Sequence, residues 1–336
     1  MDDLFKIRVL TAAVNEMTAP QMKVYNRIFR GKEHMEVSDR LAFEVITGSQ
    51  KVMGNLSIYA PAEVRDKTGR KIITLTAPRL AQKRFIHTAE LNALRAYGTQ
   101  VGVEMMKDRI AREQKDMRNE EDRTLEFWAV NALKGQILDS DLSTVLVDYN
   151  VASSHKPTLT GTNLWTHADS KPINRLRAFK KTIEDDSNAA ITGWVSFMGS
   201  EVMDALLAHD KVLDFLKYDK GSQMAETGRI QRLAEVELNE YNGFFKDVDG
   251  NIKRFIDSKY IMLVGLCDDL VDVPFAPIVD DDAPGGVGNI DAGGNGALYF
   301  SKSWKEEDPS GRWVKVETRP LPVLQRPGAV IYAKVV

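Results

Sequence analysis

The sequence contains very little cysteine and no long apolar run. One cysteine among 336 residues, Cys267, excludes an intrachain disulfide and a cysteine-rich metal site. No stretch approaches the ~18 apolar residues of a membrane-spanning helix, and the first residues lack the apolar core of a signal peptide. We therefore expect a soluble protein made in a reducing compartment, with Cys267 as a buried thiol in the apolar run Tyr260–Cys267.

The sequence also lacks an excess of one charge. It has 45 Lys and Arg against 48 Asp and Glu, a formal net charge of −3. A dedicated duplex-DNA binder usually shows a strongly basic face, so this balance argues against that class. The content of 28% charged and 43% hydrophobic residues is typical of a globular chain. The length predicts two domains or one large elaborated domain.

Motifs of the common enzyme classes are missing as well. The sequence has no Walker phosphate loop, no HExxH zinc motif and no GxSxG nucleophile elbow. The segment Gly286–Asp291 holds two of the three glycines of a dinucleotide fingerprint, but it follows an acidic loop and not a strand. We predict no enzyme activity and no cofactor.

Two groups of residues imitate parts of a cation site. Asp247 and Asp249 begin like a calcium loop, but Ser258 stands where the distal glutamate would be, so a hairpin turn explains them better. His155 and His167 are twelve residues apart, with no cysteine or carboxylate at ligand spacing. We predict that neither group binds a metal ion.

The remaining acidic groups are expected in loops. The Gly- and Asp-rich segment 279–297 carries Asp280–Asp282 and Asp291, and we predict a solvated loop there, although its sequence leaves calcium binding open. The adjacent carboxylates Asp185 and Asp186 are predicted to lie at a helix end and not to form an acid–base pair.

A β-hairpin is the clearest local structure in the first third of the chain. β-forming residues in Val52–Ala60 and Lys71–Ala77 flank the polar turn Arg65–Arg70. Neither strand is strongly apolar, and a lone two-stranded ribbon is marginally stable in water. The hairpin is therefore either the edge of a sheet or an arm that packs on a neighbouring subunit.

A long helix is predicted over Thr99–Gly135, because this stretch has no proline, one early glycine and many strong helix formers. Its middle is almost entirely charged. We predict a narrow buried seam through Ile110 and Met117 and a wide face exposed to water. Charged and polar residues at positions 113–114 and 120–121 interrupt the heptads and exclude a coiled coil.

The rest of the chain alternates strand and helix patterns. The N-terminal residues predict an arm with a short helix, which gains order by lying on its own fold or on a neighbour. Further elements are predicted at Ser143–Tyr149 (strand), Pro172–Ile183 (helix, with Ser170 and Asp169 as its cap), Ala190–Met198 (central strand), Ser200–His209 and Asp210–Lys217 (helices), Asp247–Asn251 (hairpin turn), Tyr260–Leu266 (buried strand), and Ala297–Ser303, Trp313–Arg319 and Ala329–Val336 (strands).

The order of these elements carries a family resemblance from about Phe29 to Val336. The segments that support it are the ribbon Val52–Ala77, Pro78–Phe85, the acidic helix segment Arg118–Gly135 with its Leu-Lys-Gly end, the strand Val145–Tyr149 and the tail Trp313–Leu324. In this order they resemble the lambda-type phage major capsid protein E family.

The resemblance implies an α+β chain with the HK97-like capsid fold, divided into five segments. These are an N-terminal arm and entry to the peripheral domain (1–47), an extended hairpin loop (48–80), a peripheral domain with a long spine helix (81–165), an axial α/β domain (166–296) and return strands of the peripheral domain (297–336).

The resemblance also implies a structural function. The chain would be the major capsid protein of a tailed bacteriophage, assembling as hexamers and pentamers into an icosahedral shell around double-stranded DNA, without sequence-specific binding. The implied partners are further copies, a portal protein and a separate scaffolding protein, since little chain precedes the family-like body; a decoration protein is left open. The protein would reside in the virion after assembly in the host cytoplasm, with no membrane partner.

Three other functions stay open at this point. An encapsulin-like compartment shell would have the same fold and an enzyme as cargo. A soluble enzyme with an unrecognised site would show a well-formed pocket and perturbed pKa values. A calcium-dependent binding module would use Asp280–Asp282.

The charged tip of the predicted ribbon is our candidate for contacts between subunits. Its residues are Glu63, Arg65, Asp66, Lys67, Arg70 and Lys71. Exposed ion pairs there would each contribute about 0–1 kcal/mol. Repeated over many copies, they would make shell assembly sensitive to salt.

Overall fold

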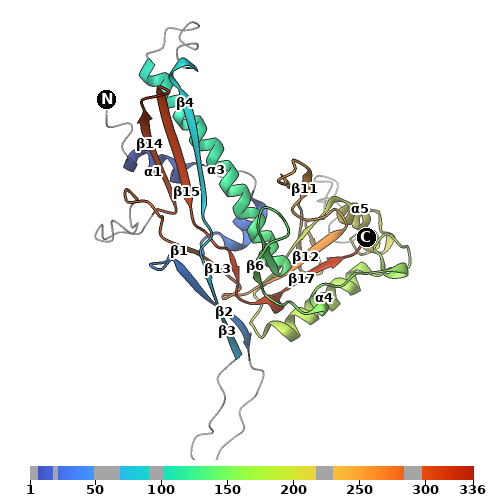
Figure 1. The fold of residues 1–336 in the computed structure, drawn as a ribbon. Helices are drawn as coiled ribbons and strands as arrows, with labels where there is room; N and C mark the ends of the chain where they lie inside the picture. The colour runs from blue at the N-terminus through green and yellow to red at the C-terminus, as the bar shows by residue number, and fades with distance from the viewer. Residues whose placement is uncertain (1–6, 18–21, 49–68, 91–101, 217–229, 284–296) are drawn as a thin grey trace, which may run out of the picture. The chain divides into compact units, whose positions relative to one another are not determined.

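The computed structural model shows a chain that forms two compact units (Figure 1). It describes residues 7–17, 22–48, 69–90, 102–216, 230–283 and 297–336. Unit 1 comprises Met1–Ala42, Thr74–Phe127 and Val273–Pro322, and unit 2 comprises Phe43–Ile73, Trp128–Asp272 and Val323–Val336. Within the described ranges, no helix combines the length and apolar character needed to cross a bilayer.

Helices and strands are mixed along the chain, as the sequence predicts for an α+β protein. The helices are α1 (Ile7–Glu16), α3 (Gly102–Lys134), α4 (Pro172–Ser187), α5 (Ser200–Ala208) and α6 (Asp210–Leu216), with short turns η2 (Tyr25–Phe29), η3 (Ser153–His155), η4 (Gly161–Asn163) and η6 (Pro327–Ala329). The strands are β1 (Glu33–Met35), β2 (Arg40–Gly48), β3 (Gly69–Thr76), β4 (Leu80–His87), β5 (Gln136–Leu138), β6 (Val145–Asp148), β7 (Gly193–Met198), β8 (Arg232–Leu233), β9 (Val236–Glu240), β10 (Phe244–Lys246), β11 (Ile252–Arg254), β12 (Tyr260–Leu266), β13 (Val271–Phe275), β14 (Tyr299–Glu306), β15 (Gly311–Thr318), β16 (Val323–Leu324) and β17 (Val330–Lys334).

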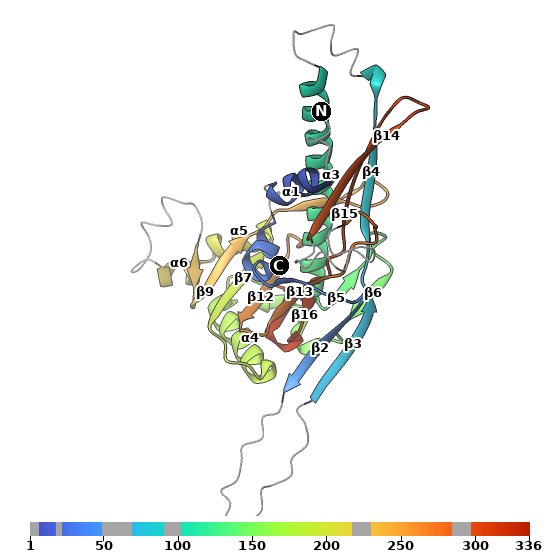
Figure 2. The same ribbon diagram turned by 90° about the vertical axis from the view of Figure 1, so that its left-hand side faces the viewer.

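Unit 1 is built on an antiparallel sheet with the strand order β14-β15-β4. The central strand β15 pairs along its whole length with both neighbours. Gln114 of α3 donates a hydrogen bond to the Ser301 hydroxyl at 2.8 Å, and Ser301 lies opposite the fully buried Val316. Side chains alternate between the faces of a strand, so this is the face that α3 covers. Helix α1 lies beside β14 (Figure 2).

Unit 2 contains a five-stranded sheet with the order β17-β12-β7-β9-β8. Strand β12 is buried over five consecutive residues, as expected for an interior strand covered on both faces. Helix α4 contacts β12 and β17 and buries Leu176, Phe179 and Ile183. Strand β7 leads directly into α5 through Gly199, where an added Cβ would lie 2.4 Å from the Cα of Ser258. Glycine therefore permits this close approach of two backbones.

The buried face of α3 carries acidic side chains, which corrects the predicted water-facing middle of this helix. Ile110 and Met117 are buried as predicted, and Glu120 is exposed. The following polar residues of the helix are nevertheless at most 9% exposed: Glu113, Gln114, Glu121, Asp122 and Glu126. The apolar pattern alone therefore underestimated the width of the buried face.

Most of these buried acids have partners inside unit 1. Asp122 accepts hydrogen bonds from the Arg118 guanidinium at 2.9 Å and from the Tyr299 hydroxyl at 2.8 Å. Glu126 accepts two backbone N–H groups at the start of η2, at 3.0 and 2.9 Å. Glu113 pairs with a guanidinium nitrogen of Arg84 at 3.0 Å. Such partners offset the cost of removing a carboxylate from water.

Glu121 is different, because both of its carboxyl oxygens are buried without a hydrogen-bond partner among the described residues. Burial raises the pKa of Glu121 to about 9. The charge of Arg118 acts in the opposite direction, whereas the nearby carboxylates of Asp122, Glu317 and Glu120 raise the pKa further. The Glu121 side chain is therefore protonated in the folded protein at neutral pH.

This protonation predicts a pH dependence of stability. The pKa of Glu121 is about 9 in the folded chain against an ordinary value of 4.5, so the folded state binds the extra proton between these values. Stability therefore falls as the pH rises through this window. We expect Glu121→Gln, which cannot ionise, to remove this fall, which amounts to several kcal/mol between pH 5 and pH 9 at about 1.4 kcal/mol per pH unit.

Urea unfolding at pH 5, 7 and 9 measures this difference. Asp108→Asn, which removes an exposed carboxylate elsewhere on α3, is the control. Equal pH slopes for the wild type and Glu121→Gln would show that Glu121 does not hold the proton.

The ribbon is present, but its described pairing differs from the predicted one. Strand β3 corresponds to the predicted strand Lys71–Ala77, and its partner is β2, which the sequence analysis did not predict. Figure 2 shows β2 and β3 side by side. Leu41, Phe43 and Val45 are buried and alternate with less buried residues, which is the strand signal that was missed. The predicted strand Val52–Ala60 lies outside the described residues.

Two further details differ from the predictions. Helix α4 begins at Pro172 as predicted, but its N-cap is Lys171, without a side-chain cap, because the Ser170 hydroxyl lies 2.9 Å from Nε2 of His209. Strands β14 and β15 belong to unit 1, whereas β17 pairs with β12 in unit 2. The segment 297–336, expected to form the return strands of one domain, is therefore divided between the two units.

Candidate functional site

A buried arginine holds the base of the β2–β3 ribbon in unit 1. Arg319 follows β15 directly and is 4% exposed. Its guanidinium forms an ion pair with Asp39 and donates hydrogen bonds to the carbonyls of Pro277, at 2.8 Å, and Ala77, at 3.1 Å. Asp39 immediately precedes β2 and Ala77 immediately follows β3. One side chain thus contacts the residue before β2 and the residue after β3, which together form the base of the ribbon.

The backbone closes the same base. The N–H of Ala77 donates to the carbonyl of Asp39 at 3.1 Å. A planar guanidinium with five N–H donors can serve a carboxylate and two carbonyls together, which a lysine ammonium on a single stem does less well. Sequence reasoning missed Arg319, because partners far away along the chain leave no local pattern.

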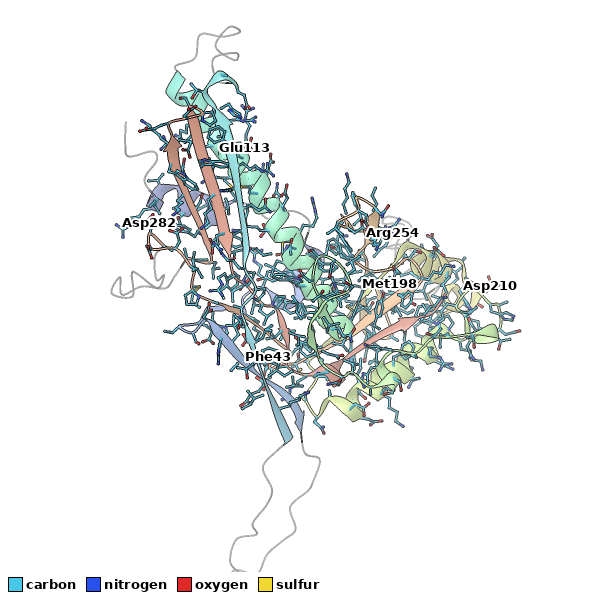
Figure 3. The ribbon with its side chains drawn as sticks, in the orientation of Figure 1. Phe43, Glu113, Met198, Asp210, Arg254 and Asp282 are labelled. Carbon is cyan, nitrogen blue, oxygen red and sulfur yellow. The ribbon has the colours of Figure 1, made fainter. Side chains whose placement is uncertain are left out.

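The ribbon is also anchored in unit 2 by aromatic packing. Phe43 of β2, labelled in Figure 3, packs against Tyr149 with ring centroids 6.3 Å apart. The Tyr149 hydroxyl accepts the backbone N–H of Leu324 at 3.1 Å, and burial raises the pKa of this hydroxyl. The described part of the ribbon is therefore fixed at several points.

A second charged network lies in unit 1, on the face of β15 opposite the one that α3 covers. Glu317 is fully buried and accepts a bidentate pair of hydrogen bonds from Arg79 at 2.7 and 2.9 Å. The Lys315 ammonium lies 2.5 Å from the same carboxylate. Burial by itself would raise the pKa of Glu317, but the hydrogen bonds from Arg79 and Lys315 outweigh it and lower this pKa. Glu317 is therefore ionised.

Asp280, predicted to lie in a solvated loop, belongs to this network. Its carboxylate lies 2.7 Å from the Lys302 ammonium and 3.0 Å from that of Lys315, with its side chain 8% exposed. Asp281 and Asp282 are exposed, and Asp291 lies outside the described residues. The solvated-loop prediction is therefore wrong at Asp280, because two lysines of the adjacent strands neutralise its charge.

Only some of the six predicted contact residues lie in the part of the chain that the structure describes. Glu63, Arg65, Asp66 and Lys67 lie outside the described residues. The backbone of Arg70 is in β3, and the side chain of Lys71 is exposed.

Lys71 has an electrostatic partner in unit 2. The pKa of Asp148 is lowered mainly by hydrogen bonds from the Asn150 N–H and the Gln136 amide, and the charges of Lys156 and Lys71 lower it further. The start of β3 therefore carries a positive charge that acts on Asp148 of β6.

The suspected cation ligands have structural partners. Asp247 accepts backbone N–H groups from Asn251 at 2.8 Å and Asp249 at 3.1 Å, which makes it the hairpin-turn residue that the sequence predicts. His155 is buried, with its ring nitrogens 2.8 Å from the Val330 carbonyl and 2.8 Å from the Asp186 carboxylate. Across the described part of the chain, no three potential ligands group around a metal position.

The predictions for Cys267 and for Asp186 can also be compared with the structure. Cys267 is half-buried where full burial was expected, because it follows the end of β12. Asp186 lies at the end of α4 as predicted, and its carboxylate lies 2.8 Å from Nε2 of His155.

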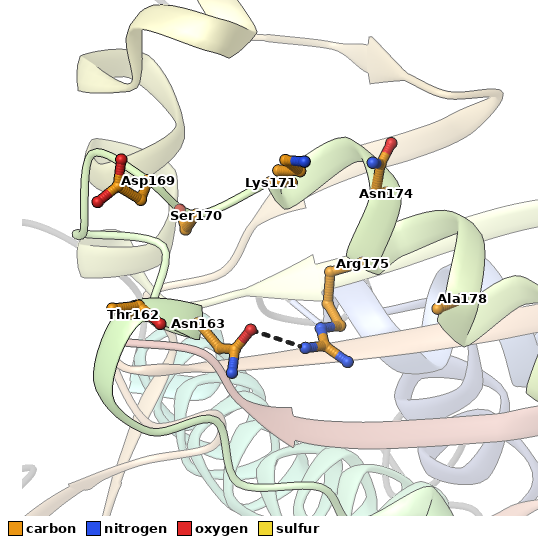
Figure 4. A pocket seen from close by; sticks show the side chains of 8 residues that line it. All are labelled: Thr162, Asn163, Asp169, Ser170, Lys171, Asn174, Arg175 and Ala178. Carbon is orange, nitrogen blue, oxygen red and sulfur yellow. Dashed lines mark hydrogen bonds between the residues drawn. The ribbon is translucent and has the colours of Figure 1, made fainter.

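A polar hollow of about 410 Å³ lies beside the start of α4 in unit 2 (Figure 4). It is lined by Thr162, Asn163, Asp169, Ser170, Lys171, Asn174, Arg175 and Ala178. The Arg175 guanidinium donates to the Asn163 amide oxygen at 3.1 Å.

The hollow adjoins a buried serine–histidine pair. Ser170 is 4% exposed, and Nδ1 of His209 is buried without a hydrogen-bond partner among the described residues. A catalytic serine–histidine pair requires a third group that orients the imidazole. We therefore interpret the Ser170–His209 pair as a structural contact inside the fold.

Comparison with solved structures defines the class of protein. Over 97% of this chain and 96% of the other, the fold matches a phage-related protein from Bordetella bronchiseptica RB50 with a TM-score of 0.60 at 12% identity. A prophage protein of Escherichia coli CFT073, described as a capsid protein, matches over 80% of each chain with a TM-score of 0.58 at 18% identity. The mature capsid of bacteriophage PhiM1 matches over 91% of this chain and 86% of that chain, with a TM-score of 0.52 at 11% identity. The chain therefore has the HK97-like fold of phage capsid proteins.

The family follows from the sequence itself. The model of the phage major capsid protein E family matches residues 6–335, so the chain belongs to this family. It is a structural shell protein of a tailed phage, not an enzyme, and forms part of the virion as a multimeric capsid. No curated protein matches the sequence.

The Arg319 contacts predict a local and a global effect of substitution. We expect Arg319→Gln to lower the free energy of unfolding by about 2–4 kcal/mol, because it leaves buried carbonyls without donors. We also expect faster hydrogen exchange at the Ala77 N–H, which closes the ribbon base. Chemical denaturation and amide exchange measure both effects.

Arg177→Gln is the control, because Arg177 is exposed on α4. If both variants unfold at the same denaturant concentration, Arg319 does not hold the ribbon base.

Proposed function

We propose that the chain assembles as hexamers and pentamers into an icosahedral shell around double-stranded DNA, and that the ribbon overlaps the next subunit. The observation that supports the overlap with the next subunit is the contact of Arg319 with Asp39 and Ala77 at the base of the ribbon. A ribbon that reaches a neighbour must leave its own subunit in a fixed direction, since each lost degree of freedom adds an entropic cost at assembly.

We assign the segments of the shell subunit by their position in the fold. The hairpin 48–80 is the extended loop, 81–165 holds the spine helix α3 of the peripheral domain, and 166–296 forms the axial domain. The five-stranded sheet with α4 and α5 supports the last assignment, because four of its strands, β7, β8, β9 and β12, come from this segment, and β17 joins them from the final one. The residues at the ribbon tip make the intersubunit ion pairs.

The proposed partners follow from the same role. They are further copies of the chain, a separate scaffolding protein, a portal protein and, as a further binding partner, a decoration protein. Assembly takes place in the host cytoplasm. The net charge of −3 suits a container whose wall encloses DNA without binding it tightly.

Shell formation is tested on the purified full chain. We expect closed shells or ring-shaped pentamers and hexamers in negative-stain microscopy and sedimentation, with the chain alone or together with the product of a scaffolding gene. A discrete monomer or dimer under all these conditions would overturn the proposed lattice.

The ribbon contacts are tested by neutralising two basic residues. We expect Arg65→Gln/Lys67→Gln to raise the protein concentration needed for assembly about threefold or more, since exposed pairs contribute up to about 1 kcal/mol each. Light scattering at increasing protein concentration measures this threshold. High salt should reduce the difference from the wild type, because it screens the pairs.

The matched control is Arg112→Gln/Lys115→Gln, which removes the same charge from the exposed face of α3. An equal threshold for both double variants would assign the effect to net charge and reject the proposed contact.

A further inference from the structure

Strand β14 lies at one edge of the three-stranded sheet of unit 1. An edge strand presents backbone N–H and C=O groups that can pair with a strand of another molecule. Natural proteins therefore cover such edges, or place charges on them. The outer edge of β14 is covered by the side chains of a helix.

Two residues of α1 bond to the backbone of β14. The Thr11 hydroxyl donates to the Ser301 carbonyl at 3.1 Å and accepts the Ser301 N–H at 3.2 Å. The Asn15 amide donates to the Tyr299 carbonyl at 2.8 Å and accepts the Tyr299 N–H at 3.3 Å. Each side chain thus satisfies one donor and one acceptor of one strand residue, as a paired strand would.

The spacing of the two elements explains this match. Thr11 and Asn15 are four residues apart and lie on one face of the helix, whereas Tyr299 and Ser301 are two apart and point to the same edge of the strand. One helical turn rises about 5.4–6 Å, and two strand residues extend about 6.6–6.8 Å. The two spacings are close enough for both pairs to form.

Apolar packing holds the helix in this place. Leu10 and Val14 are 5% and 0% exposed, and Ile7 packs against the buried cluster of Ile278, Ala283 and Phe300. The guanidinium of Arg118 on α3 reaches the Val14 carbonyl at 3.4 Å. The helix is therefore seated by its apolar face, while its polar side chains reach the strand edge.

The part of the β14 edge that is covered ends where α1 begins, at Ile7. By the alternation of the strand, Ser303 and Lys305 are the next residues whose backbone groups point to the same edge. One turn before Thr11 stands Ile7, whose side chain has no hydrogen-bonding group. Lys305 is exposed, and a lysine on an edge strand is itself a common device against pairing.

We propose that α1 is an autoinhibitory plug on the outer edge of β14, occupying the backbone groups through which a β-strand of a second copy of this chain would extend the sheet. With α1 in place, copies associate only through other surfaces. With α1 displaced, four backbone groups at the edge are free for strand addition. The inference rests on the geometry of unit 1 and does not depend on the proposed shell lattice.

The test removes the polar contacts and keeps the helix. Thr11→Val/Asn15→Ala deletes all four hydrogen bonds to the edge, while Leu10 and Val14 stay in place. We expect the Tyr299 and Ser301 amides to exchange at least tenfold faster than in the wild type. We also expect concentration-dependent association with an added intermolecular β signal in the infrared amide spectrum. Glu16→Ala, at the exposed end of α1, is the control and should change neither readout.

A second-site change shows whether the association uses this edge. Lys305→Pro removes an outward-pointing N–H of β14 beyond the part covered by α1, and proline is tolerated on an edge strand. Added to Thr11→Val/Asn15→Ala, it should reduce the association. If the association persists undiminished, or if the double variant exchanges and associates like Glu16→Ala, the plug is rejected.

The wild-type protein provides a test that does not depend on the folding of a variant. If α1 is the plug, the Tyr299 and Ser301 amides exchange at the rate of the α1 amides, because both open in the same event. The proposal is overturned if these two amides exchange at a rate that differs from that of the α1 amides.

Discussion

A carboxylate removed from water requires either a partner or a proton, and this requirement organises unit 1. Glu317 of the central strand β15 is ionised because Arg79 and Lys315 bond to it. Asp122 on α3 is held by Arg118 and Tyr299. These groups come from strand, helix and loop, so satisfying the charges also aligns the elements that carry them.

Glu121 shows the other solution to the same requirement. It lies beside Asp122 on the buried face of α3 and keeps a proton instead of finding a cation. Replacing such a group by an apolar residue is often neutral or stabilising, so its presence is weak evidence for stability. A neutral acid is nevertheless compatible with the buried face of α3, on which Met117 is fully buried.

The sequence predicted the elements of this fold well where a pattern is local. The long helix α3, the central strand β7 and the buried strand β12 all follow from residue periodicity and turn residues. Strand β2 was missed, although Leu41, Phe43 and Val45 alternate in the expected way. The width of the buried face of α3 was also missed, because charged residues at heptad positions were read as exposed.

The candidate site depends on contacts that no local pattern encodes. Arg319 reaches Asp39 and Ala77 across most of the length of the chain, and Asp280 finds its lysines on two strands. Pairing partners at such distances are set by the tertiary fold, which hydrophobic periodicity describes only indirectly. The family resemblance, in contrast, was accessible early, since it rests on the order of elements along the chain.

The interleaving of the two units has a consequence for synthesis on the ribosome. In unit 1 the central strand β15 is among the last elements made, and His87 of β4 waits for Gly311 before it can pair. In unit 2 strand β12 receives its neighbour β17 only from the final segment of the fold. Domains generally fold as units while the chain emerges, at about 5–20 residues per second. Here neither unit can complete its sheet until β15 and β17 have been translated, so β4 and β12 lack these neighbours while the chain between them is made.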